Sequence, residues 1–403
     1  MEIGEDRVAQ RVAQRVAIVG VGYSTVGRDT GLSYQQLTAQ SAKAALADAG
    51  MGPGDVDGMV LHAVGQPEPS GAGPETAVNV LLAGQMLGMA PLSFYAPAPS
   101  NFGDAANAAI AAVRAGYCHT CIAIHPCRTA RRKPPPGTPP PSSPPRMPPF
   151  GGDYQFSAPF GPPGGAGIIA GLTMQRHMSL YGTTYEQFAA QQVTQRYHAS
   201  LNEDALLREP ITVDDYLASR WISRPARLLD CDYPCDVSSA VIFTTEERAV
   251  DWHKRPVFVE AAAMSALHTT WEYVDDILEG SHKLCAETLW SRTDLSPADI
   301  DCVQLYDGFS VIARTWLEVL GFCGLGESGP FIEEGNTRLG GRIPMNTDGG
   351  VCNVGRRHGA SHCIEAVRQL RSECGVRQVP DAEAAIFTVA HGPNCHAVLL
   401  TAS

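Results

Sequence analysis

The sequence has few charged residues and no long apolar run, and these absences exclude several classes of protein. Charged residues make up 18% of the 403 residues, and the formal net charge is −12 at pH 7. A surface that binds nucleic acid needs a dense basic stripe, which this acidic chain lacks. No apolar run is long enough to span a membrane, and the N-terminus lacks the apolar core of a signal peptide. We therefore expect a soluble, cytoplasmic protein.

The twelve cysteines do not follow the pattern of a structural metal site. Such a site usually combines two close cysteine pairs in tightly turning loops. Cys118 and Cys121 have the spacing of one pair, but they stand in "GYCHTCIAIH", which predicts a helix end followed by a buried strand. Cys231 and Cys235 form another close pair. We interpret the cysteines as small apolar side chains that stay reduced, and we expect no metal.

A glycine-bearing segment near the N-terminus predicts the first strand of an α/β domain. "VAIVGVG" (16–22) is typical of a buried strand that ends in glycines. It is a weak indication of dinucleotide binding, because the third glycine of that fingerprint and its downstream acidic residue are missing. Residues 33–50 predict a helix, with Ser33 as its N-cap and Gly50 at its end. Residues 1–14 are polar and repetitive, and predict a flexible extension.

An internal repeat divides the chain into two equivalent halves. "MGPGDVDGMVLH" (51–62) aligns without gaps on "LSPADIDCVQLY" (295–306), so that His62 corresponds to Tyr306. Each copy leads into an apolar strand, and a glycine-containing loop, a helix and another strand follow. The repeat predicts a pseudo-twofold α/β protein with helices packed between sheets. Its functional groups should lie where corresponding loops converge.

A long insertion separates the halves. The segment "RRKPPPGTPPPSSPPRMPPFGG" (131–152) has too many prolines for a helix or a central strand, so we predict an exposed loop that could contact a neighbouring protein. Residues 183–202 predict a helix. We assign residues 15–130 and 227–250 to the first half, 131–226 to the inserted region and 251–403 to the second half.

Five motifs, in order, resemble the thiolase superfamily, and specifically thiolase-like proteins of the sterol-carrier-protein-X type. They are "YGTTYEQFA", "RLLDCDYPCD", "LYDGFS", "LEVLGFCGLGE" and "NTDGGVCNVGRRHG". The resemblance covers nearly the whole chain from Arg15 onward. It implies a duplicated five-layer α/β thiolase fold, here with a long inserted loop region. It also implies an acyl-CoA substrate and a homodimeric core.

Four groups that thiolases need have no counterpart in this chain. The nucleophilic cysteine, which a helix N-terminus activates in thiolases, falls at or near Ser100 in "APSNFGDAANAA". Arg356 replaces the histidine that activates that cysteine, and Tyr306 replaces the histidine of the "H-D-x-F" motif. The C-terminal "C-x-G" cysteine has no equivalent in "VAHGPNCHA". We therefore do not expect condensation or thiolysis of the thiolase kind.

The tyrosine at position 306 resembles that of the thiolase-like aldolases that break down steroid side chains. Those enzymes cleave a β-hydroxyacyl-CoA into a ketone and a shorter acyl-CoA, and work with an OB-fold/zinc-ribbon partner protein. The resemblance implies the same reaction on a bulky, steroid-like substrate, the same kind of partner, and no cofactor besides the CoA thioester. A retro-aldol reaction needs no acyl-enzyme, only a base for the hydroxyl proton and donors around the thioester oxygen.

Three residues are the candidate catalytic groups. Tyr306 suits proton exchange with the alkoxide. Arg356 cannot act as a base at neutral pH, so we expect it to stabilise a tyrosinate or the enolate. His358 could protonate the enolate or hold the thioester carbonyl. Residues that we expect to support the site or bind substrate are Asp307, which should orient its loop, Asn346, Gly349, Gly350 and Ser100.

A purely structural role remains an alternative for these residues. Tyr306 could simply be packed at a strand end, and His358 could be structural. The arginines could be a solvated surface run, although we expect Arg356 to point inward and Arg357 outward. Two other functions also remain: an acyltransferase in a multi-subunit complex that uses Ser100 as acyl acceptor, and a non-catalytic subunit that scaffolds a partner.

Overall fold

A computed structural model describes most of the chain outside the N-terminus and the proline-rich segment. Nearly all of the expected N-terminal extension and the whole of the expected proline-rich loop lie outside the described residues. The ranges described are 14–62, 78–89, 91–129, 166–267, 276–278, 280–390, 392 and 394–403.

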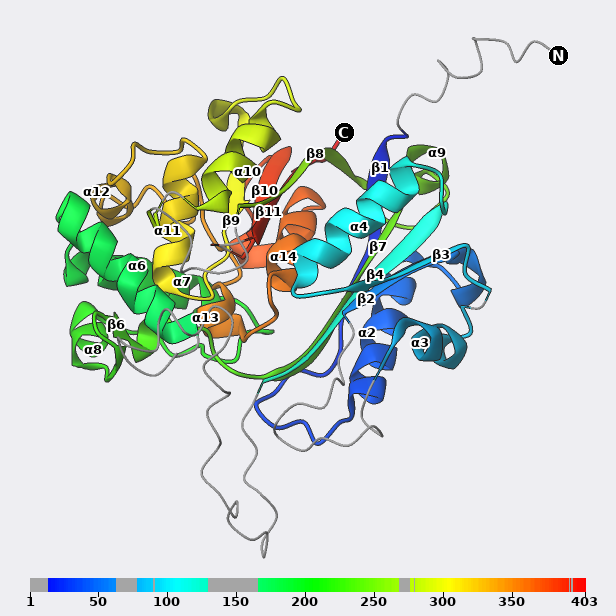
Figure 1. Cartoon of the computed structure of the whole chain (residues 1–403), viewed down its shortest axis with the longest axis horizontal. Coiled ribbons are helices and arrows are strands. Elements are labelled where there is room, and N and C mark those ends of the chain that lie inside the picture. The colour runs from blue at the N-terminus through cyan, green and yellow to red at the C-terminus, as the bar shows by residue number, and fades with distance from the viewer. Residues whose placement is uncertain are drawn as a thin grey trace, which may run out of the picture.

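Nine strands form one mixed sheet in the order β3-β2-β4-β7-β1-β8-β11-β10-β9 (Figure 1). The first five strands in this order come from the first half of the chain, and the last four from the second half. Their bounds are β1 (Val16–Tyr23), β2 (Gly58–His62), β3 (Phe94–Ala98), β4 (Thr120–Arg128), β7 (Asp236–Thr245), β8 (Val257–Ala266), β9 (Cys302–Gln304), β10 (Ala384–Val389) and β11 (Asn394–Thr401); β5 (Trp221–Ser223) and β6 (Ala226–Arg227) form a separate small ribbon.

The strand pairing repeats between the halves. In the first half β2 is parallel to β4, and β4 and β1 are both antiparallel to β7. In the second half β9 is parallel to β10, and β10 and β8 are both antiparallel to β11. Strands β1 and β8 join the two halves in antiparallel pairing. The predicted pseudo-twofold organisation is confirmed.

The aspartates of the internal repeat do the same work in each half. Each repeat copy forms a short 3₁₀ turn, Pro53–Asp55 or Pro297–Asp299, and then a strand. Asp57 accepts the backbone N–H of Thr120 where β4 begins, and Asp301 accepts that of Ala384 where β10 begins. The repeated sequence therefore fixes the register between each repeat strand and its parallel neighbour.

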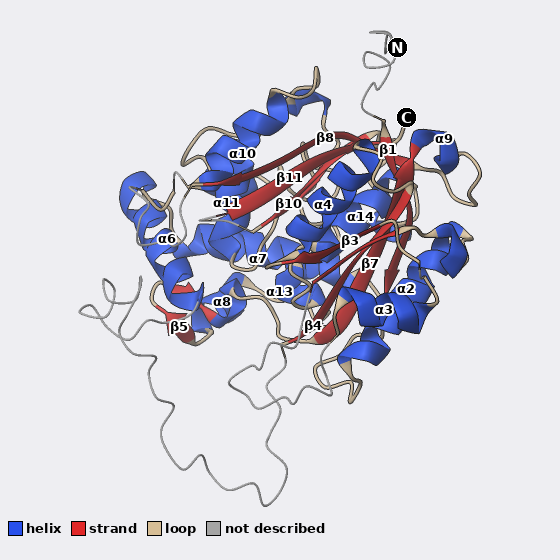
Figure 2. Cartoon of the chain, turned by 45° about the vertical axis from the view of Figure 1, so that its right-hand side comes forward, coloured by secondary structure: helices blue, strands red, loops and turns tan. Residues whose placement is uncertain are grey.

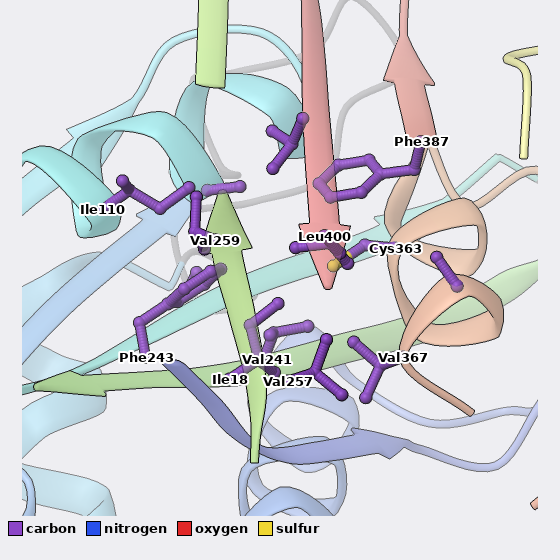
Figure 3. Close-up of a cluster of buried hydrophobic side chains, with 14 of the residues drawn as sticks. Ile18, Ile110, Val241, Phe243, Val257, Val259, Cys363, Val367, Phe387 and Leu400 are labelled. Atoms are coloured by element: carbon purple, nitrogen blue, oxygen red, sulfur yellow. The ribbon is translucent and has the colours of Figure 1, made fainter. Parts of the chain in front are cut away.

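The helices complete a five-layer arrangement, which confirms the expected thiolase fold class. Helices α4 (Phe102–Arg114) and α14 (Ala360–Leu370) lie between the strands of the two halves (Figure 2). The close-up in Figure 3 shows their apolar residues Ile110 and Val367 facing the strands across this middle core. Two outer cores hold the other main helices: α2 (Tyr34–Ala49) and α3 (Val80–Leu87) on the first half, and α10 (Ser281–Trp290) and α11 (Ser310–Val319) on the second.

The inserted region packs against the outer side of the second half. One buried contact that holds it there joins His177 of α6 to Glu318 of α11, at 3.0 Å. The remaining helices are α6 (Ala166–Tyr181), α7 (Tyr185–Ser200), α8 (Val213–Ala218), α9 (Glu246–Ala249), α12 (Ser328–Glu333) and α13 (Val351–Val354). Among the described residues, no helix is long and apolar enough to cross a membrane. All twelve cysteines are free thiols and ten are buried, as predicted.

The glycines of the first strand allow α2 to pack directly on β1. A Cβ atom at Gly22 would lie 2.4 Å from the backbone nitrogen of Ala45 and 2.7 Å from the carbonyl carbon of Ala44. Backbone atoms cannot move aside as a flexible side chain can. These glycines therefore serve helix packing, which agrees with the sequence pattern being only a weak indication of dinucleotide binding.

We expect Gly22→Ala to destabilise the fold by about 1–3 kcal/mol, because the added methyl group would push α2 off the strand. Urea unfolding at neutral pH would measure this change. Gly54→Ala is the matched control, since a Cβ atom there meets nothing within 4 Å. Equal unfolding midpoints for the two variants would contradict the packing argument.

Candidate active site

A cavity of about 280 Å³ contains the three candidate catalytic residues. It lies where the end of β9, the loop before α14 and helix α6 meet. A larger hollow, of about 620 Å³, lies beside β1 and α2 and includes none of the predicted site residues, so we place the site in the smaller cavity. The described residues that line it are Ile169, Ala170, Thr173, Asp232, Tyr306, Gly308, Phe309, Ile312, Arg356, His358 and Ala390.

Tyr306 stands at the end of β9 with its ring in this cavity. Its backbone N–H donates to the Thr388 hydroxyl on the neighbouring strand at 2.9 Å, which fixes the strand end. Burial raises the pKa of Tyr306; Asp232 raises it further, and Arg356 opposes the shift. The phenol is therefore neutral in the resting protein and suits proton donation.

Arg356 is held in the cavity by a bidentate ion pair with Asp232. Its Nε and Nη2 atoms donate to the two carboxylate oxygens at 2.6 and 2.5 Å. Asp232 is buried, whereas about a third of the Arg356 side chain is exposed. Burial lowers the pKa of Arg356, but the bonds to Asp232 outweigh this effect and raise it. Arg356 is thus a fixed positive charge, as its bidentate geometry favours.

His358 faces the cavity from the same loop, with a left-handed backbone (φ 45°). Its Nδ1 atom lies 3.1 Å from Nε2 of His125 and 4.0 Å from the Cys127 sulfur. Burial lowers the pKa of His358 to about 3, with further lowering by Arg356 and His62. The ring is therefore neutral, and Nε2 is the nitrogen left for a substrate.

The supporting glycines allow the loop to approach its neighbours closely. A Cβ atom at Gly350 (φ +70°) would lie 2.1 Å from an oxygen of Asp307, and one at Gly349 (φ +110°) would lie 2.5 Å from the Cβ atom of Ala199. Asp307 is fully buried; its other oxygen accepts the Val351 N–H at 2.9 Å. Asp307 is therefore placed to orient the loop and does not line the cavity.

Asn346 also lies outside the cavity and binds the loop to β9. Its side chain accepts the Leu305 N–H at 2.7 Å and donates to the Leu305 carbonyl at 2.9 Å. The Asn346 carbonyl lies 3.2 Å from Nδ1 of His198, and the Leu339 N–H donates to the other ring nitrogen at 3.2 Å. Neutral His198 therefore links two loop segments behind the site.

Ser100 is not among the described residues that line the cavity. It is exposed, just before the N-cap of α4, and its N–H donates to Asp104 at 3.1 Å. The carbonyl of His358 accepts the Phe102 N–H at 3.2 Å, so the loop before α14 contacts the first residue of α4. His396 of β11 lies 3.2 Å from Asp104 in the first turn of α4 and is not among the described residues that line the cavity either.

The expected outward position of Arg357 is wrong. Its side chain is buried and stacks on the ring of Tyr23, with 4.3 Å between the guanidinium carbon and the ring centroid. It donates to the backbone carbonyls of Asp204 and Val354 at 3.1 and 2.9 Å. Two backbone carbonyls and an aromatic face thus stabilise the buried guanidinium in place of the water molecules that would surround an exposed arginine.

Sequence reasoning overlooked several residues of this site. Asp232 stood in the motif "DCDYPCD" without a role of its own. His125 and Cys127 alternate along β4 and therefore point to the same face, which is a signal that the apolar interpretation of cysteines discounted. The wall from α6 had no signal in the sequence, because that helix follows the proline-rich segment and its contacts are purely tertiary.

Comparisons with known proteins place this site in a family. A family model described as Thiolase C-terminal domain-like matches residues 263–400. The 17-hydroxy-3-oxo-4-pregnene-20-carboxyl-CoA lyase of Mycobacterium tuberculosis is 33% identical over 397 residues, which are 96% of this chain and 99% of the relative. A steroid side-chain-cleaving aldolase of Thermomonospora curvata is 31% identical over 398 residues, 96% and 97% of the two chains.

Two solved structures are also similar. An Ltp2-ChsH2(DUF35) aldolase matches with a TM-score of 0.83 and 30% identity over 96% of this chain and 97% of the other. A monomeric SCP2-thiolase like protein from Mycobacterium smegmatis shares the fold, with a TM-score of 0.68 at 15% identity over 96% of this chain and 77% of the other. The chain is therefore a member of the thiolase superfamily. Within it, the chain belongs to the family of thiolase-like, steroid side-chain-cleaving aldolases, which confirms the resemblance found in the sequence.

The neutral His198 behind the loop predicts a stability loss in acid. Burial lowers its pKa to about 4, whereas in the unfolded chain it has the ordinary value of about 6.5. Its contribution is thus complete above pH 6.5 and is lost as the pH falls towards 4. This predicts a loss of about 2 kcal/mol between pH 7 and pH 5 from this group alone. Urea unfolding at both pH values should show a smaller loss in His198→Gln; an equal loss would mean that the native histidine titrates normally.

Proposed function

We propose that this protein is a carbon–carbon lyase that cleaves a β-hydroxyacyl-CoA by a retro-aldol reaction, giving a ketone and a shorter acyl-CoA. One observation carries the proposal: the Tyr306 phenol, the Arg356 guanidinium and the His358 imidazole converge on one cavity. The names of the relatives, a pregnene-carboxyl-CoA lyase and a side-chain-cleaving aldolase, support a CoA thioester with a steroid-derived acyl group.

The cleavage step balances with the groups in the cavity. Because both groups are neutral at rest, we give them the reverse of the roles expected from the sequence, and Nε2 of His358 accepts the proton of the β-hydroxyl group. That oxygen becomes the ketone oxygen as the Cα–Cβ bond breaks. The electron pair of that bond passes into the thioester as an enolate. Tyr306, protonated in the resting state, gives a proton to Cα and so completes the shorter acyl-CoA. The proton on His358 then returns to Tyr306 through solvent.

Arg356 stabilises the enolate oxygen as negative charge develops there. Its Nη1 group makes no hydrogen bond among the described residues, so it remains available to a ligand, while the other two nitrogens hold Asp232. A charge that is fixed in advance needs no reorganisation during the reaction. Asp232 is a positioning residue in this scheme, because it aims Arg356 without contacting the reacting atoms.

An apolar part of the cavity lining, the apolar wall, suits a hydrocarbon. Ile169 of α6 and Phe309 and Ile312 at the start of α11 supply apolar side chains to the same cavity. A mostly apolar pocket with a few converging polar groups is the usual form of a small-molecule site. We assign the acyl group's ring system to this wall.

The protein's active form, we further propose, is a complex. The aldolase structure that it matches contains a DUF35 protein, and we propose a partner of that kind, with an OB-fold and a zinc ribbon, bound to a homodimeric core of this chain. The reaction as written uses no cofactor besides the CoA thioester.

We expect Tyr306→Phe to lower the cleavage rate by about 10²–10⁴-fold, because a positioned proton donor is lost. The free energy of unfolding should change by only about 1 kcal/mol, since the ring still packs. The assay would use the full chain with its DUF35-type partner and a steroid-derived β-hydroxyacyl-CoA, with ketone and acyl-CoA products followed by mass spectrometry.

Tyr233→Phe is the matched control for this variant, because its hydroxyl contacts only Arg28, at 3.1 Å, among the described residues. A Tyr306→Phe rate close to that of the unmodified protein would show that the phenol only packs. An acyl adduct on Ser100, or no cleavage by the complete complex, would overturn the aldolase proposal in favour of the acyltransferase or the scaffold.

The two neighbouring arginines should separate catalysis from stability. Arg356→Gln should lower kcat by about 100-fold, since the enolate loses its fixed charge. Arg357→Gln should leave kcat of the folded protein within a few-fold but lower the urea midpoint, because it loses the stacking on Tyr23 and the hydrogen bonds to the Asp204 and Val354 carbonyls. The reverse ranking would mean that Arg357 carries the charge that matters.

A further inference from the structure

We propose that His125, Cys127 and His358 form a binding site for a thiophilic divalent cation such as Zn²⁺, and that the bound ion inhibits cleavage by engaging His358. The binding site stands on the geometry of these three residues. The inhibitory effect rests in addition on the proposed function.

The three potential ligand atoms already lie close to the spacing that a tetrahedral ion needs. His125 Nε2 and His358 Nδ1 are 3.1 Å apart, the Cys127 sulfur is 4.0 Å from Nδ1, and all three atoms lie within 4.8 Å of one another. Around tetrahedral zinc, two nitrogens lie about 3.3 Å apart and a nitrogen and a sulfur about 3.6 Å apart. The two His358 distances are therefore within about half an ångström of these values, and the His125–Cys127 pair needs to approach by at most about 1.2 Å to close the site.

Local structure explains why these side chains meet. His125 and Cys127 are two residues apart on β4, so they project from the same face of the strand. The antiparallel pairing of β4 with β7 opposite Ser239 and Val237 fixes both backbones. His358 reaches them from the loop that precedes α14, with a left-handed backbone that few non-glycine residues adopt. A rigid strand thus supplies two ligands and the loop supplies the third.

The chemistry of the ligands selects the ion. A thiolate and two imidazoles suit Zn²⁺, Co²⁺ and similar soft or borderline ions, whereas Mg²⁺ and Ca²⁺ take oxygen ligands. His125 and Cys127 are 1% and 4% exposed, so the ion would be enclosed on the side of β4. Three protein ligands leave a fourth coordination position open.

Binding would change the role of His358 in cleavage. The ion takes Nδ1, the nitrogen that faces β4, and the ring proton must then sit on Nε2, the nitrogen assigned to the substrate. His358 then donates a proton instead of accepting one. His125 and Cys127 are not among the described residues that line the cavity. The ion therefore acts through His358 and not by direct contact with the substrate.

Cobalt binding tests the site independently of catalysis. We expect the full chain, treated with a chelator and then titrated with Co²⁺ alone, to bind one ion with a thiolate-to-cobalt absorption band and intense visible bands of tetrahedral cobalt. Cys127→Ser should lose the charge-transfer band and bind about 100-fold more weakly. Cys323→Ser, which changes a partly buried cysteine elsewhere, is the matched control and should behave like the unmodified chain.

A second variant guards against misfolding of Cys127→Ser. His125→Asn should keep the charge-transfer band at saturating Co²⁺ but weaken binding, with circular dichroism to check both folds. Absence of the band in the unmodified chain, or a band that persists in Cys127→Ser, would overturn the proposed site.

An inhibition assay with Zn²⁺ separates the inhibitory effect from the proposed function. Zn²⁺ should inhibit cleavage by the complex formed with the unmodified chain, and inhibition of the Cys127→Ser complex should need about 100-fold more Zn²⁺. Equal inhibition of both complexes, or none, would overturn the inhibitory effect. A chain that binds Co²⁺ through Cys127 but shows no cleavage without metal would retain the metal site and lose the proposed function.

Discussion

The loop that carries Arg356 and His358 depends on the close contact between Gly350 and the buried carboxylate of Asp307. A side chain at Gly350 would collide with that carboxylate, and the Val351 N–H can reach it only because the backbone comes so near. The same carboxylate lies 3.0 Å from His362 on α14. The side chain of Asp307, the residue after Tyr306, therefore connects the start of α13 to the middle helix α14.

The charge distribution in the cavity follows from this framework. Burial keeps Tyr306 and His358 neutral, so the lasting charges among the described lining residues are those of the Arg356–Asp232 pair. The ion pair offsets part of the free energy needed to remove the arginine from water, whereas an unpaired arginine at this position would destabilise the fold. In the proposed reaction, a proton passes from the substrate to His358 and from Tyr306 to the enolate, and both groups start in the protonation state that this direction of transfer requires.

Much of the fold was predictable from the sequence, because the repeat, the strand-ending glycines and the capped helices are local signals. The convergence of Tyr306, Arg356 and His358 followed from the motifs. The environment of each residue did not follow, because burial is a tertiary property: nothing in "GRRHG" shows that Arg356 meets Asp232 while Arg357 stacks on Tyr23. The motifs likewise predicted site roles for Asn346 and Ser100. In the structure Asn346 lies behind the site, and Ser100 is not among the described residues that line the cavity.

The internal repeat gives a reason why a histidine cluster lies beside the tyrosine. His62 and Tyr306 occupy equivalent strand ends, and the pseudo-twofold arrangement brings both towards the same loop. His62 stacks on His125 with 4.5 Å between ring centroids, and His125 contacts His358, which shares the cavity with Tyr306. The first half thus contributes imidazoles that support His358 from behind, and the second half contributes the phenol that lines the cavity. Each half thus keeps a polar residue at the strand end where the halves meet, and the two residues serve different parts of the site: Tyr306 lines the cavity, whereas His62 stacks behind it on His125.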